Sequence, residues 1–284
     1  MYVRLIGRLG NQLFQYAAGR RLAALKSADL RLDTTYYGWR SRDRYELGVL
    51  RISPKLARRT EIAALRGSRV SRLLHPGMHT AARLVEPHFH FWPDLLSRRE
   101  PVVYLDGYWQ SERYFVDIRD TLLRELVPQQ APSKEARRLM DLAAEPDAVS
   151  VHVRRGDYVH DPRTSVVHPA LPLGYYERAV ARLVREGLRP HLFVFSDDVT
   201  WCRAYFKIGT AAGITFVSDQ IDSPVEELHL MRHFRSHIIA NSSFSWWGAW
   251  LADHPDKRVI APAQWFTNTD RDDRDLVPAE WTRL

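Results

Sequence analysis

The sequence predicts an α/β protein with two lobes and, in its second half, a mostly parallel sheet. The chain has 284 residues, which is close to the size of about 250–300 residues at which a single hydrophobic core stops growing. Its first residues predict a strand, a tight turn and a helix, and its second half alternates apolar strands with helices. This alternation is typical of parallel sheets with right-handed crossovers.

The first half contains fewer clear elements than the second. Apolar residues at helical spacing follow the turn at residues 7–11, and Asn11 is the expected N-cap of that helix. Between about residues 40 and 100 the pattern weakens into Arg-rich pieces. The expected elements are strands over 2–7 and 29–33, a strand and loop over 101–111, and helices over 12–25 and 111–127.

Prolines at 128, 132 and 146 separate this half from the next and predict the boundary between two lobes, 1–145 and 146–284. In parallel α/β sheets, ligands bind outside the carboxyl ends of the strands. Three polar clusters of the second half follow such strands. The expected strands lie over 148–154, 191–198, 214–219, 237–242 and 258–262, and the helices over 173–187, 199–206, 224–236 and 243–253.

The charge of the chain favours an acidic partner. The net charge is +7, and only five of the 41 basic residues are lysines. Arginine binds phosphate oxygens in a planar, bidentate manner, so a nucleotide, a nucleic acid or an anionic membrane surface each fits this bias. A general preference for Arg over Lys at surface positions would produce the same composition.

Several classes of protein are disfavoured. The single cysteine, Cys202, leaves no disulfide framework and no Cys-based zinc site. No segment reaches the roughly 18–20 apolar residues of a membrane span, and the first residues do not read as a signal peptide. We therefore expect a cytoplasmic protein, with peripheral membrane contact through Arg-rich stretches such as residues 58–74.

The first polar cluster, HVRRGD, follows the strand over 148–154. Arg154 and Arg155 offer donors that match phosphate oxygens, and Gly156 allows close approach of a ligand. Because side chains alternate along a strand, one arginine should face the ligand and the other should hold the loop by an ion pair. Asp157 either orients a guanidinium or accepts a proton. A purely structural Arg–Asp pair is the competing interpretation.

The second cluster, FSDD, ends the next strand with Asp197 and Asp198. Adjacent carboxylates can bind a divalent metal, accept hydrogen bonds from guanine, or cap the following helix. No further oxygen ligands lie in neighbouring positions, so capping and base recognition are favoured over a metal.

The third cluster, NSSF, lies between a strand and a helix. Asn241, Ser242 and Ser243 precede a helix whose first amides have no intrahelical partner and attract anions. His229 and His233 stand four residues apart, but no HExxH motif accompanies them, so a metal site there is disfavoured. The three clusters together predict a site for a nucleoside diphosphate.

The chain resembles the bacterial and animal alpha-1,2-fucosyltransferase family in these clusters and in several other segments. The similar segments span nearly the whole chain and occur in the family's order; HxRRGD and SSFSWWGAW are the specific ones. They are GRLGNQLFQYAAGRRLA, GYWQSERYF, VHVRRGDY, HPALPLGYYERAV, FSDD and IIANSSFSWWGAWL.

This resemblance implies the GT-B architecture, with two facing Rossmann-like lobes. Residues 1–145 would form the acceptor-side lobe and residues 146–284 the lobe that binds GDP-L-fucose. The enzyme would transfer L-fucose with inversion to the 2-hydroxyl of a galactose-containing oligosaccharide or lipid-linked glycan. It would need no obligatory metal and no cofactor beyond the donor substrate.

The resemblance also implies roles for individual residues. Arg154 would stabilise the departing pyrophosphate, with Asp157 and Asn11 completing the catalytic group. Gly10, Asn11 and Gln12 would form the loop near the transferred sugar, and Asp197 or Asp198 would recognise guanine. The implied donor-binding residues are His152, Arg154, Arg155, Asp197, Asp198, Asn241, Ser242, Ser243 and Phe244.

Other functions remain open at the level of sequence. A glycosyltransferase with another nucleotide sugar would share the phosphate-binding residues. A nucleic-acid-binding protein would use the positive charge, but its basic residues should gather in one patch, whereas Arg is spread along this chain. An inactive sugar-binding relative would have lost the HxRRGD residues.

Overall fold

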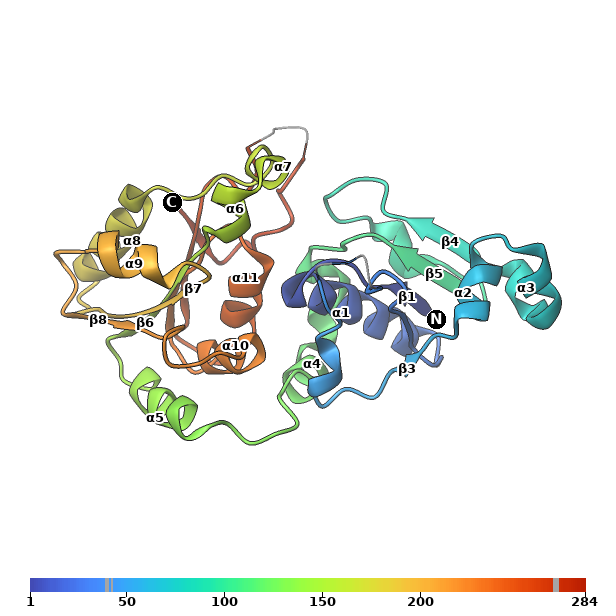
Figure 1. Ribbon diagram of the computed structural model, residues 1–284, viewed down its shortest axis with the longest axis horizontal. Helices are drawn as coiled ribbons and strands as arrows, with labels where there is room; N and C mark the ends of the chain where they lie inside the picture. Colours follow the sequence, from blue (N-terminus) through green and yellow to red (C-terminus); the bar gives the residue numbers. More distant parts are fainter. Residues whose placement is uncertain (39–40, 42, 268–270) are drawn as a thin grey trace. The chain divides into compact units, whose positions relative to one another are not determined.

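A computed structural model describes residues 1–38, 41, 43–267 and 271–284 (Figure 1). The chain divides into two compact units. Unit 1 comprises Met1–Val127 with Asp272–Pro278, and unit 2 comprises Pro128–Arg271 with Ala279–Leu284. Each unit contains a parallel sheet flanked by helices, which confirms the predicted α/β fold class.

Unit 1 is built on a five-stranded parallel sheet in the order β3-β2-β1-β5-β4. Between the strands the chain forms helices and short 3₁₀ turns. The strands are β1 (Tyr2–Arg4), β2 (Arg31–Asp33), β3 (Lys55–Leu56), β4 (Ala82–Val85) and β5 (Val103–Asp106); the helices are α1 (Leu9–Leu25), α2 (Arg59–Leu65), α3 (Arg69–Leu74) and α4 (Arg119–Glu125).

Two local predictions in unit 1 are wrong. Helix α1 begins at Leu9, so Asn11 lies in its first turn and Arg8 is the N-cap residue. The carboxylate of Glu46 accepts a hydrogen bond from the Leu9 amide at 2.8 Å and so caps the helix from a distant loop, which no local pattern reveals. The helix expected over 111–127 is divided into two 3₁₀ turns followed by α4.

Unit 2 is built on a six-stranded parallel sheet in the order β8-β7-β6-β9-β10-β11. This is the strand order of a doubly wound dinucleotide-binding fold. Its strands are β6 (Ala148–Val153), β7 (His191–Ser196), β8 (Gly213–Phe216), β9 (Ser236–Ile238), β10 (Arg258–Ala261) and β11 (Thr282–Arg283); its helices are α5 (Lys134–Ala143), α6 (Gly156–His160), α7 (Pro162–Ser165), α8 (Leu173–Arg185), α9 (Val199–Tyr205), α10 (Pro224–Met231) and α11 (Ser243–Trp250).

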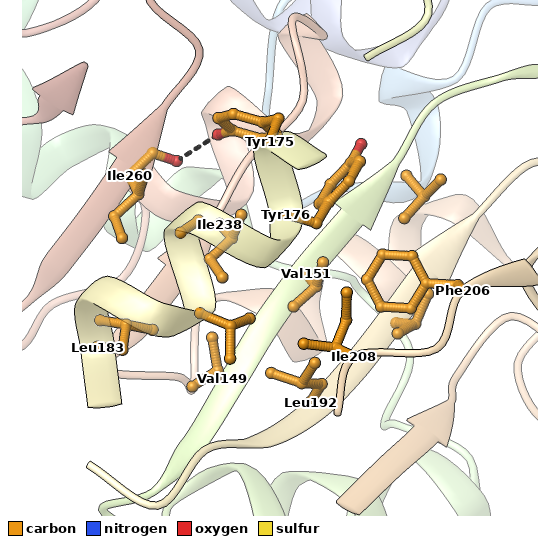
Figure 2. Packing of buried hydrophobic residues seen from close by; sticks show 14 of the residues in the cluster. Val149, Val151, Tyr175, Tyr176, Leu183, Leu192, Phe206, Ile208, Ile238 and Ile260 are labelled. Atoms are coloured by element: carbon orange, nitrogen blue, oxygen red, sulfur yellow. Dashed lines mark hydrogen bonds between the residues drawn. The ribbon is translucent and has the colours of Figure 1, made fainter. Parts of the chain in front are cut away.

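The alternation of side chains along the strands of unit 2 fills one core on each face of the sheet. Val149 and Val151 of β6 pack with Leu183 of α8 and Phe206, next to α9, as Figure 2 shows. The Tyr175 hydroxyl donates a hydrogen bond to the Ile260 carbonyl at 3.1 Å and ties α8 to β10. Apolar residues that point to both faces of a strand are typical of parallel sheets covered by helices on both sides.

Packing on the opposite face of this sheet assigns helix α5 to unit 2. Ala136 and Leu139 of α5 pack with Phe193 and Phe195 of β7 and with Met231 of α10. The boundary predicted at residue 145 therefore falls after this helix, whereas the units divide at residue 127. Proline spacing marked the linker, but the packing of α5 decides to which unit it belongs.

Helix α11 is anchored by a cation at its C-terminal end. The Lys257 ammonium donates hydrogen bonds to the carbonyls of Ala249 and Ala252, both at 3.0 Å. Nearby His237 is 1% exposed, and its Nε2 donates to the Phe234 carbonyl at 3.0 Å. Burial, with the charge of Lys257 as a further cause, lowers the pKa of His237 to about 3.

This buried histidine should make the stability of the fold depend on pH. Between pH 6.5 and about 3 the unfolded chain binds a proton at His237 that the folded chain excludes, so acidification favours unfolding. We expect the His237→Gln variant to lose about 2 kcal/mol less stability between pH 7 and pH 5 than the wild type does. Urea unfolding at both pH values measures this difference.

The same replacement at exposed His160 is the control, because it removes a histidine that does not lie in the core. An identical loss of stability on acidification in the wild type and in His237→Gln would contradict the assignment.

Candidate functional site

The predicted polar clusters lie at neighbouring strand ends in unit 2. From β6 the chain adds β7 and β8 on one side of the sheet and then β9, β10 and β11 on the other, so the order switches between β6 and β9. Ligands of doubly wound sheets bind in the crevice at this switch point. The HVRRGD cluster follows β6, the NSSF cluster follows β9, and the FSDD cluster follows β7, which pairs with β6 on its other side.

Arg154 is a buried cation held by two carboxylates. Its side chain is 13% exposed, and its Nη2 and Nη1 lie 2.6 Å from Asp157 Oδ1 and 3.1 Å from Asp197 Oδ2. Burial lowers the pKa of Arg154, but the two carboxylates outweigh this effect and raise it, so the guanidinium stays charged. Its buried Nε has no hydrogen-bond partner in the described structure. The guanidinium is therefore a fixed positive charge with one N–H that no described protein atom accepts.

Asp157 orients this guanidinium through the 2.6 Å hydrogen bond. Of the two roles open at the level of sequence, the geometry favours the positioning role over that of a proton acceptor. A short charge-assisted bond of this kind is among the stronger hydrogen bonds in proteins.

Gly156 is required by the carboxylate of Asp197. A Cβ atom at this position would lie 2.3 Å from Asp197 Oδ2, far closer than van der Waals contact allows. The structure thus gives a steric reason for glycine here, and close approach of a ligand at Gly156 stays a prediction. Glycine lets the loop after β6 close over the carboxylate that pairs with Arg154.

Arg155 turns to other partners. Its Nε lies 3.3 Å from Asp198 Oδ2, and its guanidinium stacks 3.8 Å from the centroid of the Trp201 ring. The backbone amide of Arg155 donates to Asp197 Oδ1 at 2.9 Å. The side chains of the two arginines thus pair with different carboxylates. Both residues follow the end of β6 at Val153, so alternation along the strand does not apply to them, and each forms an ion pair rather than one alone.

The FSDD carboxylates are used internally. Asp198 caps α9 by accepting a hydrogen bond from the Trp201 amide at 3.1 Å, which confirms the capping prediction. With the contacts to Arg154 and Arg155, each of the four carboxylate oxygens of Asp197 and Asp198 has a protein partner. Both carboxylates therefore have structural roles, and recognition of guanine by either of them stays a prediction.

His152 lies on β6 beside the buried arginine. Burial and the charge of Arg154 lower the pKa of His152 to about 3, so the ring is neutral at physiological pH. Its Nδ1 is buried and has no partner in the described structure, and the ring centroid lies 5.5 Å from that of Phe244. His152 and Phe244 therefore form an aromatic pair next to the charged donor.

The NSSF residues divide into two groups. Ser242 is the N-cap residue of α11 and makes no side-chain capping bond, and Ser243 opens the helix. Asn241 instead braces two loops, because its Nδ2 donates to the carbonyls of Pro169 at 3.0 Å and Trp265 at 3.1 Å. The amide nitrogen of Asn241 therefore has a structural role, and its contact with the donor stays a prediction.

A column of stacked groups, which sequence reasoning did not predict, supports Arg154. The guanidinium lies 5.3 Å from the centroid of Tyr158, Tyr158 stacks on His168 at 5.1 Å, and His168 packs against Phe266 at 5.1 Å. Burial lowers the pKa of His168 to about 4, with Arg271 and Arg154 among the causes. The HPALP segment carried the resemblance, but nothing local to it indicated stacking beneath an arginine.

The first-lobe candidates lie at the corresponding switch point of unit 1, between β1 and β5. Asn11 Oδ1 accepts a hydrogen bond at 2.7 Å from Gln110 Nε2, which follows β5. Gln12 is fully buried, and its amide nitrogen donates to the carbonyls of Gly7 and Arg44 at 3.0 and 2.7 Å. Gln12 therefore braces the loop, whereas Asn11 and Gln110 form a polar pair. Gly10 lies inside α1, and the turn uses Gly7 at φ 74°.

Two searches over the described residues bear on metals and membranes. No group of three or more His, Cys, Asp or Glu side chains among them is placed to hold a metal ion. Within the same residues, no helix combines the length and the apolar character that crossing a membrane requires.

The comparisons with known proteins agree with these features. The sequence model of glycosyl transferase family 11 matches residues 94–284. An alpha-1,2-colitosyltransferase of Escherichia coli is 30% identical over 99% of this chain and 97% of its own length. The O-antigen biosynthesis glycosyltransferase WbnK of Escherichia coli is 30% identical over the full length of both chains.

A galactoside alpha-(1,2)-fucosyltransferase 2 of Mus musculus is 28% identical over 93% of this chain and 75% of its own length. The family match includes all three polar clusters of unit 2, and the bacterial relatives extend the similarity over both units. The chain is therefore a glycosyltransferase and belongs to glycosyl transferase family 11.

Proposed function

We propose that this enzyme transfers L-fucose from GDP-L-fucose to the 2-hydroxyl of a galactoside, with inversion, and forms an alpha-1,2 linkage. The observation that carries the proposal is the largely buried guanidinium of Arg154 at the switch point of unit 2. It is held by two carboxylates, and its Nε has no partner among the described residues. The relatives named as fucosyltransferases support the choice of sugar.

The proposed chemistry requires stabilisation of a leaving group. Breaking the bond between the sugar and GDP builds negative charge on the pyrophosphate, and fixed donors aimed at that charge lower the barrier without reorganising. Arg154 supplies one such donor, and the first-turn amides and hydroxyls of α11 at Ser242 and Ser243 supply others. This set supports transfer that needs no metal.

The neighbouring residues hold these donors or extend the site. Asp157 positions Arg154, and Arg155 fixes the loop against α9. His152, neutral and with an unpaired Nδ1, and the ring of Phe244 contact the nucleotide in this proposal.

The acceptor is a galactose unit of an oligosaccharide or of a lipid-linked glycan. In unit 1, Asn11 is the residue proposed to lie near the transferred sugar, and Gln110 orients its side chain. An amide neither removes nor supplies a proton at neutral pH, so Asn11 orients hydroxyl groups by hydrogen bonding.

A second donor has a specific observation in its favour. The bacterial relative named as an alpha-1,2-colitosyltransferase matches nearly the whole chain. Colitose is fucose without its 3-hydroxyl, so the two donors share the diphosphate and differ at one hydrogen-bonding group. A site built to bond a hydroxyl discriminates against its deoxy analogue by about 10⁴–10⁵ in kcat/KM.

The direct test is a transfer assay in EDTA with GDP-fucose, GDP-colitose and UDP-galactose as donors. Lactose and lacto-N-biose serve as acceptors, and nuclear magnetic resonance of the product identifies the linkage. We expect an alpha-1,2-fucosylated galactoside. The matched control is an acceptor whose galactose lacks the 2-hydroxyl, which should yield no product. Transfer of colitose alone would replace the donor, and transfer from UDP-galactose alone would overturn the proposal.

The stacked column beneath Arg154 should influence the rate of transfer. Replacing His168 by Ala removes the ring between Tyr158 and Phe266 and loosens the guanidinium. Because misplacement by about 1 Å can cost on the order of 100-fold in rate, we expect kcat to fall by about 10- to 100-fold while KM for the acceptor changes little.

Steady-state kinetics of a second variant isolate the stacking contribution. His168→Phe retains an aromatic ring of similar size, so it should restore most of the activity that His168→Ala loses. If His168→Phe were as impaired as His168→Ala, stacking would not be the function of His168.

A further inference from the structure

The α2–α3 segment of unit 1 carries a strong excess of positive charge. Residues 55–80 contain six Lys or Arg residues and one carboxylate. That carboxylate, Glu61, faces inward: it is 7% exposed, accepts a hydrogen bond from the Arg58 amide at 2.7 Å and pairs with Arg31. The basic residues are Lys55, Arg58, Arg59, Arg66, Arg69 and Arg72.

Helix α3 presents apolar side chains to solvent within this segment. Val70, Leu73 and Leu74 are 72%, 81% and 66% exposed. Their spacing of three and four residues places them on one face of the helix. A contiguous exposed apolar face of this kind, next to unpaired charge, is typical of an interaction surface.

The rest of the segment is anchored, so this exposure is not a sign of a detached helix. Ile62 and Leu65 of α2 pack with Tyr2 and Tyr104 of the sheet. Met78, in the 3₁₀ turn Pro76–Thr80 that follows α3, packs against the same cluster. Figure 1 draws α3 at the outer edge of unit 1, beyond α2. The sheet thus anchors the helix before α3 and the 3₁₀ turn after it.

Two arginines of the segment are exposed and unpaired among the described residues. Arg59, at the start of α2, and Arg69, at the start of α3, are exposed, and neither forms an ion pair in the described structure. Other basic residues of the segment are neutralised: Lys55 pairs with Asp29 and Arg66 with Asp33. We call Arg59, Arg69, Val70, Leu73 and Leu74 the α3 surface.

We propose that the α3 surface binds an anionic lipid bilayer. Aliphatic side chains that enter the boundary between headgroups and acyl chains, flanked by arginines that attract anionic headgroups, form the pattern of an interfacial amphipathic helix. A nucleic-acid site would instead use aromatic rings for stacking, and the α3 surface contains none. The inference does not depend on which sugar the enzyme transfers.

The test is sedimentation of the full chain with vesicles of phosphatidylcholine alone or with about one third phosphatidylglycerol. We expect binding to the anionic vesicles that weakens at high salt, because screening shortens the reach of the charges. Each arginine near such a surface contributes about 1 kcal/mol, so Arg59→Ser with Arg69→Ser should lower the partition coefficient on the order of 30-fold. Leu73→Ser with Leu74→Ser should also weaken binding.

Matched controls come from unit 2. Arg137→Ser with Arg185→Ser removes the same charge from exposed positions of α5 and α8, and Leu142→Ser removes a 40% exposed leucine of α5. These variants should bind vesicles as the wild type does. Thermal unfolding and GDP binding should be unchanged in every variant, because none of these residues lies in the donor site.

Four results would overturn the proposal. Equal binding to neutral and anionic vesicles would remove the electrostatic basis. Vesicle binding that neither double variant reduces would place the contact elsewhere. If the wild type instead dimerised with increasing concentration and did not bind vesicles, loss of that dimerisation in Leu73→Ser with Leu74→Ser would assign the α3 surface to a second copy of the chain. Binding of an oligonucleotide that is lost in Arg59→Ser with Arg69→Ser would assign the α3 surface to a nucleic acid.

Discussion

The contact between Arg154 and its two carboxylates organises the site in unit 2. A buried charge is costly unless it is paired and hydrogen-bonded. Asp157, in helix α6 after β6, and Asp197, in the loop after β7, supply that pairing. Because both carboxylates bind the Nη atoms, the Nε remains without an acceptor in the part of the chain that the structure describes. A guanidinium fixed in this way needs little reorganisation when an anion binds or when charge develops on it.

Several neighbouring residues hold Arg154 and its two carboxylates in place. Gly156 leaves room for Asp197, Asp198 holds Arg155 against Trp201, and the column from Tyr158 to Phe266 supports the guanidinium from beneath. The carboxylates that resemble a base-recognition or metal motif in the sequence therefore act as internal partners of arginine.

The sequence was sufficient for the parallel α/β fold and for the clusters after β6, β7 and β9, since strand ends and polar residues are local features. It was also sufficient for the capping role of Asp198. It was insufficient where contacts join distant segments: Glu46 caps α1 from a loop, α5 packs into unit 2, and Asn241 braces two loops. His168 escaped prediction for the same reason, because its stacking partners lie far apart along the chain.

The central claim is that Arg154 binds the diphosphate of a nucleotide, and calorimetric titration of GDP and GMP in EDTA tests it most directly. The Arg154→Lys variant keeps a positive charge beside Asp157 and Asp197 but loses the fork of donors. The account predicts that the wild type prefers GDP over GMP and that this preference falls by about tenfold or more in Arg154→Lys, since a hydrogen bond to a charged group contributes about 1.5–3 kcal/mol. An unchanged ratio of the two affinities in a folded variant would contradict it.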